Sequence, residues 1–97
     1  MNRTELDGTI SELETLRHTP AGIALLRFRI RHESDLVEAG ALRRVTLDLA
    51  AVALGEPAAY LAGLDTGTRV SVVGFLAPQR LGSDRLVLHI QDVVHTS

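Results

Sequence analysis

Arginine is the residue type in this sequence with the clearest capacity to bind a ligand, and three arginines alternate along one short segment. Arg27, Arg29 and Arg31 are separated by single residues, so on a β-strand their side chains share one face at intervals of about 6.5–7 Å. An extended nucleic-acid strand presents phosphates at a similar spacing. The alternative is a solvated face whose arginines pair with acids such as Asp48 on a neighbouring strand, a gain of only about 0–1 kcal/mol.

Two further pairs of arginines flank predicted connections between strands. Arg43 and Arg44 stand at the entry of a predicted strand, and Arg80 and Arg85 bracket a turn between two later strands. In a small barrel we expect these regions to lie near one another, at the side where loops grip a single strand. A guanidinium group can pair with phosphates and stack on bases. The alternative is that these arginines only end strands and solubilise loops.

The remaining reactive residue types form no catalytic or metal-binding motif. The four histidines His18, His32, His89 and His95 lack the spacing of a metal site. The chain contains no cysteine, no G-x-S-x-G motif and no glycine-rich phosphate loop. We therefore expect a protein that is not an enzyme and that has no metal and no cofactor.

The charge of the chain is modest but unevenly distributed. Its 97 residues include ten arginines, no lysine and twelve acidic residues, for a net charge of −2. Such a balance argues against a strong nucleic-acid binder, which usually carries a basic surplus. Residues 17–44, however, hold six of the ten arginines and only three of the acidic residues. The basic charge is thus concentrated in one part of the chain.

Aromatic side chains, on which bases stack, are scarce. Phe28, Tyr60 and Phe75 are the only ones. Both phenylalanines are expected in the core, and Tyr60 is expected to pack on a helix with its hydroxyl at the surface. Because stacking contributes about 1–3 kcal/mol per base, we expect any grip on a single strand to be weak and strongly dependent on salt.

The length predicts a single domain over residues 1–97. No apolar run approaches the roughly 18 residues of a membrane helix, and residues 1–10 show no charged-then-apolar leader. Together with the lack of cysteine, these features favour a cytoplasmic protein without membrane contact.

Apolar residues recur at every second position over most of the chain, which is typical of β-strands. Gly8 and a phase slip at Leu25 and Leu26 predict bends or bulges. The polar segment 33–40 is predicted to be a loop, and a short helix is predicted to begin at Glu56 and Pro57. The expected strands are residues 5–13, 23–32, 42–53, 69–76 and 86–91.

The order of three strands, one helix and two strands predicts an all-β, five-stranded OB-fold barrel with one short helix between strands three and four. Bends at Gly8 and Leu25 would supply the curvature that barrel closure requires. A ferredoxin-like fold would need a second helix, and residues 20–40 offer none.

Short motifs in a constant order connect the chain to a known family. It resembles the primosomal replication protein N (PriB) family, the small single-strand-binding proteins of bacterial replication restart. The matching motifs are Asn2-Arg3, Leu6-Asp7-Gly8-Thr9-Ile10, Pro20-Ala21-Gly22-Ile23, His32-Glu33-Ser34, Glu38-Ala39-Gly40, Gly74-Phe75-Leu76-Ala77 and Leu86-Val87-Leu88-His89.

Members of that family are homodimers of OB-folds and are not catalytic. The resemblance implies that this protein binds single-stranded DNA, stimulates the PriA helicase and helps to assemble the primosome. Arg17 looks matched to a basic position before the first turn, with Thr19 near the DNA path. The full set of candidate DNA-binding residues is Arg17, Thr19, Arg27, Arg29, Arg31, Arg43, Arg44, Arg80 and Arg85.

Three positions depart from the family pattern. Ala41 and Thr46 stand where the family uses aromatic side chains for DNA contact, and Glu33 stands where it has a basic residue. Each departure favours weaker DNA contact. The rival hypothesis is therefore a protein-interaction module whose main partner is the helicase, with only weak residual DNA binding.

Overall fold

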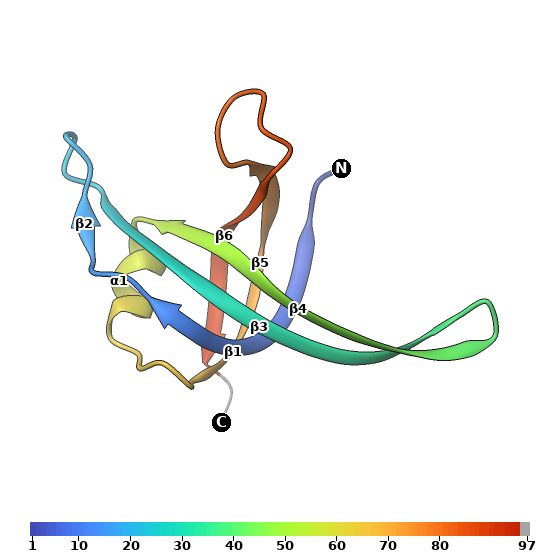
Figure 1. Cartoon of the computed structure of the whole chain (residues 1–97). Helices are drawn as coiled ribbons and strands as arrows, with labels where there is room; N and C mark the ends of the chain where they lie inside the picture. The colour runs from blue at the N-terminus through green and yellow to red at the C-terminus, as the bar shows by residue number, and fades with distance from the viewer. Residues whose placement is uncertain (96–97) are drawn as a thin grey trace.

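The structure, a computed structural model, describes residues 1–95. Within them the chain forms six strands and one short helix around a single barrel (Figure 1). In chain order these elements are β1 (Thr4–Leu13), β2 (Arg17–His18), β3 (Ala24–Glu38), β4 (Ala41–Leu54), α1 (Glu56–Ala62), β5 (Arg69–Pro78) and β6 (Leu86–His95).

The strands close into the predicted OB-fold barrel. They are ordered β1-β5-β6-β4-β3-β2, and an additional pairing of β1 with β3 joins the two sides of the sheet. The pairing of β4 with β6 is parallel, and the other pairings are antiparallel. The helix lies between the third and fourth long strands, as expected. Its place between β4 and β5 in the numbering reflects the two-residue strand β2, which the sequence pattern did not indicate.

Strand β1 serves both sides of the barrel because it bends near Gly8. Residues 4–9 pair with β5, whereas residues 9–13 pair with β3, with a register shift between Ile10 and Glu12. A Cβ atom at Gly8 would overlap the carbonyl oxygen of Arg31, so the bend depends on this close approach of two backbones. The bend predicted at Gly8 thus corresponds to a close backbone approach at that residue, whereas the register shift lies beyond it, between Ile10 and Glu12.

The bulge predicted at Leu25 and Leu26 is wrong, because β3 pairs with β4 without interruption from Leu25 to Glu38. The second register shift lies instead in the β5–β6 pair, between Val73 and Gly74. Leu25 faces outward opposite Leu54 and next to β2, so its apolar side chain needs no change of phase.

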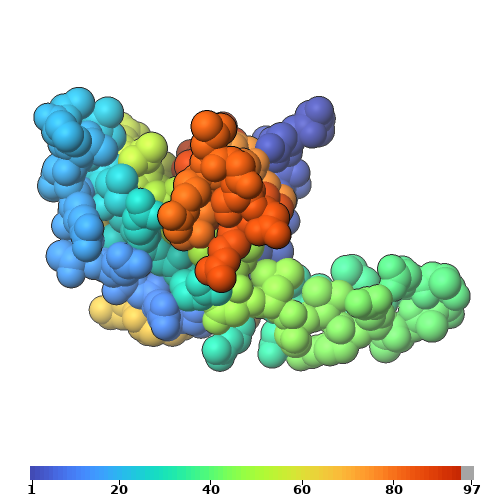
Figure 2. Space-filling view, turned by 45° about the horizontal axis from the view of Figure 1, so that its top comes forward, coloured from blue at the N-terminus to red at the C-terminus, as the bar shows by residue number. Residues whose placement is uncertain are grey.

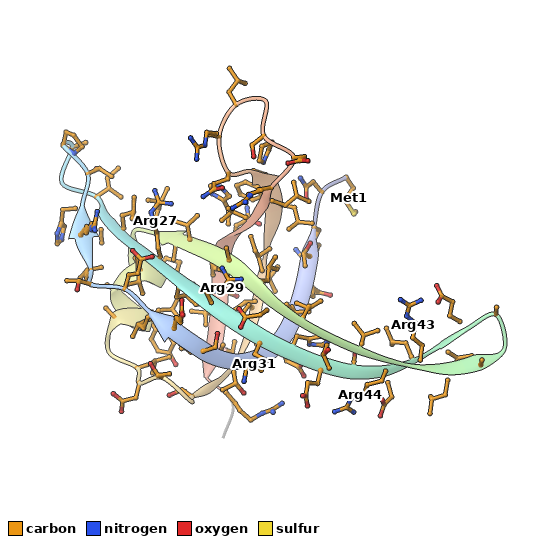
Figure 3. All side chains as sticks on the ribbon, viewed as in Figure 1. Met1, Arg27, Arg29, Arg31, Arg43 and Arg44 are labelled. Carbon is orange, nitrogen blue, oxygen red and sulfur yellow. The ribbon has the colours of Figure 1, made fainter. Side chains whose placement is uncertain are left out.

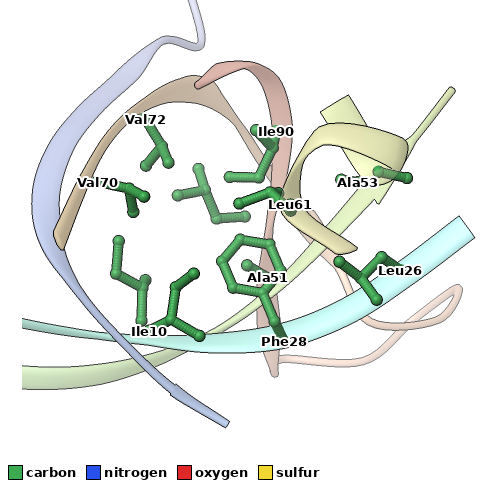
Figure 4. Packing of buried hydrophobic residues seen from close by; sticks show 12 residues of the cluster. Ile10, Leu26, Phe28, Ala51, Ala53, Leu61, Val70, Val72 and Ile90 are labelled. Carbon is green, nitrogen blue, oxygen red and sulfur yellow. The ribbon is translucent and has the colours of Figure 1, made fainter. Parts of the chain in front are cut away.

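The core is apolar throughout, and no buried polar or charged side chain is found among residues 1–94, whose burial the structure describes. The inward residues of β3 interlock with those of β4, β5 and β6, and α1 covers one open end of the barrel with Ala58 and Leu61. Figure 4 shows this packing. Helix α1 is the one helix among residues 1–95, and at seven residues it is far too short to cross a membrane.

The segment 33–40 is not the predicted loop. Strands β3 and β4 continue beyond the barrel as a two-stranded ribbon, residues 33–46 (Figure 2), which ends in a tight turn. Ala39 and Gly40 at that turn both have positive φ angles, 52° and 78°, which suits a two-residue hairpin connection. Polar residues lie on both faces because neither face of the projecting ribbon is covered, so the pattern lacks the alternation that marks a half-buried strand.

Gly74 gives a direct test of this geometry. A Cβ atom at this position would overlap the carbonyl oxygen of His89 on the paired strand. We expect Gly74→Ala to lower the free energy of unfolding by at least about 2 kcal/mol, because two backbones must separate. Gly63→Ala is the matched control, since its nearest contact is an ordinary 3.5 Å. Equal denaturant midpoints for the two variants would contradict the close approach of β5 and β6.

Candidate nucleic-acid interface

The arginines of β3 face outward, as their alternation predicts. Leu26, Phe28 and Ile30 are buried between them, and Figure 3 shows Arg27, Arg29 and Arg31 spaced along the same strand. This outer face of β3 and β4 is the surface on which OB-folds commonly bind oligonucleotides.

Two of these three arginines are engaged with Asp48 on β4. Arg29 Nε donates to Asp48 Oδ1 at 2.7 Å, and Arg29 Nη2 donates to the Asp48 carbonyl oxygen at 2.9 Å. Arg31 Nη2 lies 3.8 Å from Asp48 Oδ2. The solvated, acid-paired arrangement is thus present for Arg29 and Arg31. Because the side chains are 38–63% exposed, such pairs contribute little and can be exchanged at small cost.

Arg27 differs from its two neighbours on the strand. It is exposed, and among residues 1–95 no carboxylate lies within ion-pair distance of it. Its guanidinium therefore needs no exchange of partners before it meets an anion.

The loop between β5 and β6 comes close to the outer face that carries Arg27, Arg29 and Arg31, which we call the arginine face. Gln79 N–H donates to the Arg85 carbonyl oxygen at 2.8 Å, and Ser83 N–H donates to the Arg80 carbonyl oxygen at 3.0 Å, so the loop has a defined turn. Arg85 and Arg29 line one cavity. The side chains of Arg80 and Arg85 are exposed, and neither has a carboxylate partner in the described part of the chain.

Arg43 and Arg44 lie on the ribbon rather than beside that loop, as Figure 3 shows. Arg43 Nη1 is 2.7 Å from Glu38 Oε1, while Arg44 contacts Glu33 at 2.9 Å and Asp35 at 3.2 Å. Arg44 lines a cavity with Arg31 and Arg69, separate from those of Arg80 and Arg85. The expected meeting of the two arginine pairs is wrong, because continued pairing of β3 with β4 carries Arg43 and Arg44 outward.

Arg17 and Thr19 lie at the other end of the arginine face. Arg17 pairs with Leu25 on β3 and is exposed. The hydroxyl of Thr19 accepts a hydrogen bond from Ile23 N–H at 3.1 Å, and Thr19 N–H donates to the Ile23 carbonyl oxygen at 2.8 Å. Thr19 therefore holds the turn that positions Arg17.

Sequence reasoning missed one feature of this surface. The prediction that Phe75 lies in the core is wrong, because it is half-buried on the outer face. Its ring is stacked on that of His89, with ring centroids 4.9 Å apart and planes 9° apart. The inward positions are taken by Val72, Gly74 and then Leu76, so the alternation simply continues along β5. In the sequence this is one of two phases that the pattern allows, because Val72 and Val73 are both apolar. The prediction for Phe28 is confirmed, since it is buried, and Tyr60 on α1 is 43% exposed.

Among residues 1–95 no three histidine or acidic side chains gather as a metal site would require. The surface therefore offers cations, small apolar side chains and one stacked aromatic pair. These groups suit an elongated anionic ligand with flat rings.

Comparison with known proteins gives consistent matches over the whole barrel. The family model described as "Another single-strand binding protein family" matches residues 2–92. The replication restart protein PriB of Bordetella pertussis is 48% identical over 91 residues, which cover 94% of this chain and 85% of that protein.

Two solved structures share the architecture. The protein PriB from Ralstonia solanacearum superposes with a TM-score of 0.89 at 32% identity, covering 100% of this chain and 99% of that chain. The single-stranded DNA binding protein from Thermus aquaticus superposes with a TM-score of 0.79 at 22% identity, covering 100% of this chain and 50% of that chain. At this lower identity the likeness concerns the fold alone.

Proposed function

This chain belongs to the single-strand binding family whose model it matches and to the family of replication restart proteins PriB. We therefore propose that it binds single-stranded DNA in replication restart, without catalysing a reaction. It takes part in primosome assembly and stimulates a PriA-type helicase. That role places it with the chromosome in the bacterial cytoplasm.

One observation carries the DNA-binding part of this proposal. The outer face of β3 bears Arg27, Arg29 and Arg31, with the turn that follows Arg17 beside the start of β3 and the loop that carries Arg85 beside Arg29. A cationic face between these two loops is the usual place for a single strand on an OB-fold. The geometry therefore unites arginines that lie far apart in the sequence.

The same surface explains why the grip is expected to be weak. Thr46 on β4 stands opposite Glu33, so this part of the face has neither an aromatic ring nor a surplus of positive charge. Asp48 competes with phosphates for Arg29 and Arg31. Most of the attraction then depends on a few unpaired arginines and is sensitive to salt.

The salt dependence of DNA affinity tests this assignment. The logarithm of affinity should fall linearly with the logarithm of salt concentration, by about 0.7 per phosphate contacted on a single strand. Replacing Arg80 and Arg85 together by Ala should flatten the slope by about 1.4 on the same basis. The change is measured by fluorescence anisotropy with a labelled oligo-dT.

Two control variants sharpen the experiment. Replacing Arg43 and Arg44 by Ala should flatten the slope less, because both are already paired with acids. Asp48→Asn should steepen it, because this change releases Arg29 and Arg31. An unchanged slope in the Arg80 and Arg85 variant would remove these residues from the binding site.

A second candidate function is supported by the ribbon. Its tip exposes Leu36 at 55%, Val37 at 73% and Leu42 at 75%, whereas its arginines are neutralised by Glu33, Asp35 and Glu38. Exposed apolar side chains without a surplus of positive charge suit a protein partner better than DNA. We therefore propose that the ribbon contacts the helicase, which keeps the interaction-module hypothesis open as the rival to DNA binding.

Substitutions at the tip separate the two roles. Replacing Leu36, Val37 and Leu42 by Ser should weaken binding of a PriA-type helicase by tenfold or more and leave oligo-dT affinity unchanged, with both measured at the same salt concentration. Leu81→Ser is the matched control, since Leu81 is fully exposed in the loop between β5 and β6. Loss of DNA binding with intact helicase binding would contradict the assignment. If the unaltered protein binds the helicase but no DNA measurably, the interaction module is its main function.

We also propose that the protein is a homodimer, as the family resemblance implies and as its small core favours. Two copies would present two arginine faces to one strand. Sedimentation velocity at micromolar concentration should show a species of twice the chain mass. A single species of one chain mass under these conditions would refute the dimer.

A further inference from the structure

We propose that His89, backed by Phe75, is a stacking platform for one base of single-stranded DNA, in a groove between β4 and β6. The inference rests on the proposed function and extends it, because it gives the weak electrostatic surface a separate apolar contact with a base.

The two rings are pre-arranged for stacking. Phe75 and His89 occupy directly paired positions on β5 and β6, and their rings are nearly parallel at a centroid distance of 4.9 Å. Such offset stacking holds a ring in place. One face of His89 is thereby supported by Phe75 on β5, and β4 lies on the other side of β6, where Val52 is paired with His89.

A groove of about 330 Å³ opens on the β4 side of His89. Its apolar lining includes Val52 and Ile90, both buried to more than nine-tenths, and it is completed by Leu54, Pro57, Phe75 and Gln91. A base lying over Val52 places one face against His89. The amide of Gln91 can hydrogen-bond to the edge of any base, because it both donates and accepts. The groove therefore offers a ring, an apolar lining and an adaptable polar group.

The charged side chains around the groove favour binding of a nucleic-acid strand. They also set the direction in which the strand runs from the base on His89. In the part of the chain that the structure describes, no carboxylate lines the groove. Arg27, Val52, His89 and Phe75 are successive paired positions across β3, β4, β6 and β5, so Arg27 lies about 10 Å from His89 at about 4.8 Å per strand.

The opposite side of the groove is acidic. Glu56 and Asp92 line the neighbouring cavity beside Tyr60. A phosphate next to a base on His89 is therefore attracted toward Arg27 and repelled from the helix side. Outward-facing Ala50 and Val87 continue the groove toward Arg29 and Arg85, so a strand that starts on His89 leads onto the arginine face.

Substitutions at His89 test the platform with a labelled oligo-dT, by anisotropy over a series of salt concentrations. His89→Leu should weaken binding about tenfold at every salt concentration without changing the slope, because stacking is not electrostatic. His89→Phe should bind like the unaltered protein, and Phe75→Leu should give an intermediate loss. Tyr60→Leu is the matched aromatic control and should have no effect. An abasic oligonucleotide should bind the unaltered protein and His89→Leu equally well.

The outcomes separate this proposal from the proposed function. Salt-dependent binding that is equally tight in His89→Leu would overturn the platform and leave DNA binding intact. A complete lack of oligo-dT binding by the unaltered protein would overturn both. A loss in His89→Leu that coincides with dissociation of a dimer in sedimentation would assign the groove to contact between two copies and overturn the platform. Thermal melting checks that each variant is folded, which is expected because neither ring belongs to the core.

Discussion

The uninterrupted antiparallel register between β3 and β4 is the constraint on which the rest of this structure depends. Fourteen consecutive residue pairs, from Leu25 with Leu54 to Glu38 with Ala41, leave no position at which the two strands can change phase. Because side chains alternate strictly along such a pair, burial of Leu26, Phe28 and Ile30 forces the intervening arginines outward. The same register extends beyond the barrel and forms the ribbon.

The sequence was sufficient for the barrel because its inward face is strongly apolar and its turns contain glycine or proline. It was not sufficient to predict the structure of the segment 33–40, because the end of β3 there projects from the barrel and packs against no core. There the stabilising contacts run across the ribbon, from Arg44 to Glu33 and Asp35, and join residues nine and eleven positions apart. Such pairs are visible only once the register is known, so an exposed ribbon and a polar loop have the same sequence signature.

The position of Phe75 shows a second limit. Val72 and Val73 are both apolar, so the pattern allows either phase to continue to the bulky ring. The structure resolves this choice at Gly74, which takes the inward position against the backbone of His89 because any side chain there would overlap it. A large aromatic residue at the next position must then face outward. Packing of backbone against backbone, which leaves no trace in hydropathy, thus decides where the ring goes.

The net charge of −2 is a poor guide to what this surface can bind, because the acids on β3 and β4 are already paired with particular arginines. Asp48 holds Arg29 and Arg31, and the ribbon acids hold Arg43 and Arg44. An arriving phosphate must replace a carboxylate at those sites, and the exchange of one exposed ion pair for another yields little free energy. Affinity then has to come from the unpaired arginines and from contacts that salt does not screen. On an OB-fold with so few aromatic residues, an outward-facing ring pair at the end of the arginine face matters more than any single additional charge.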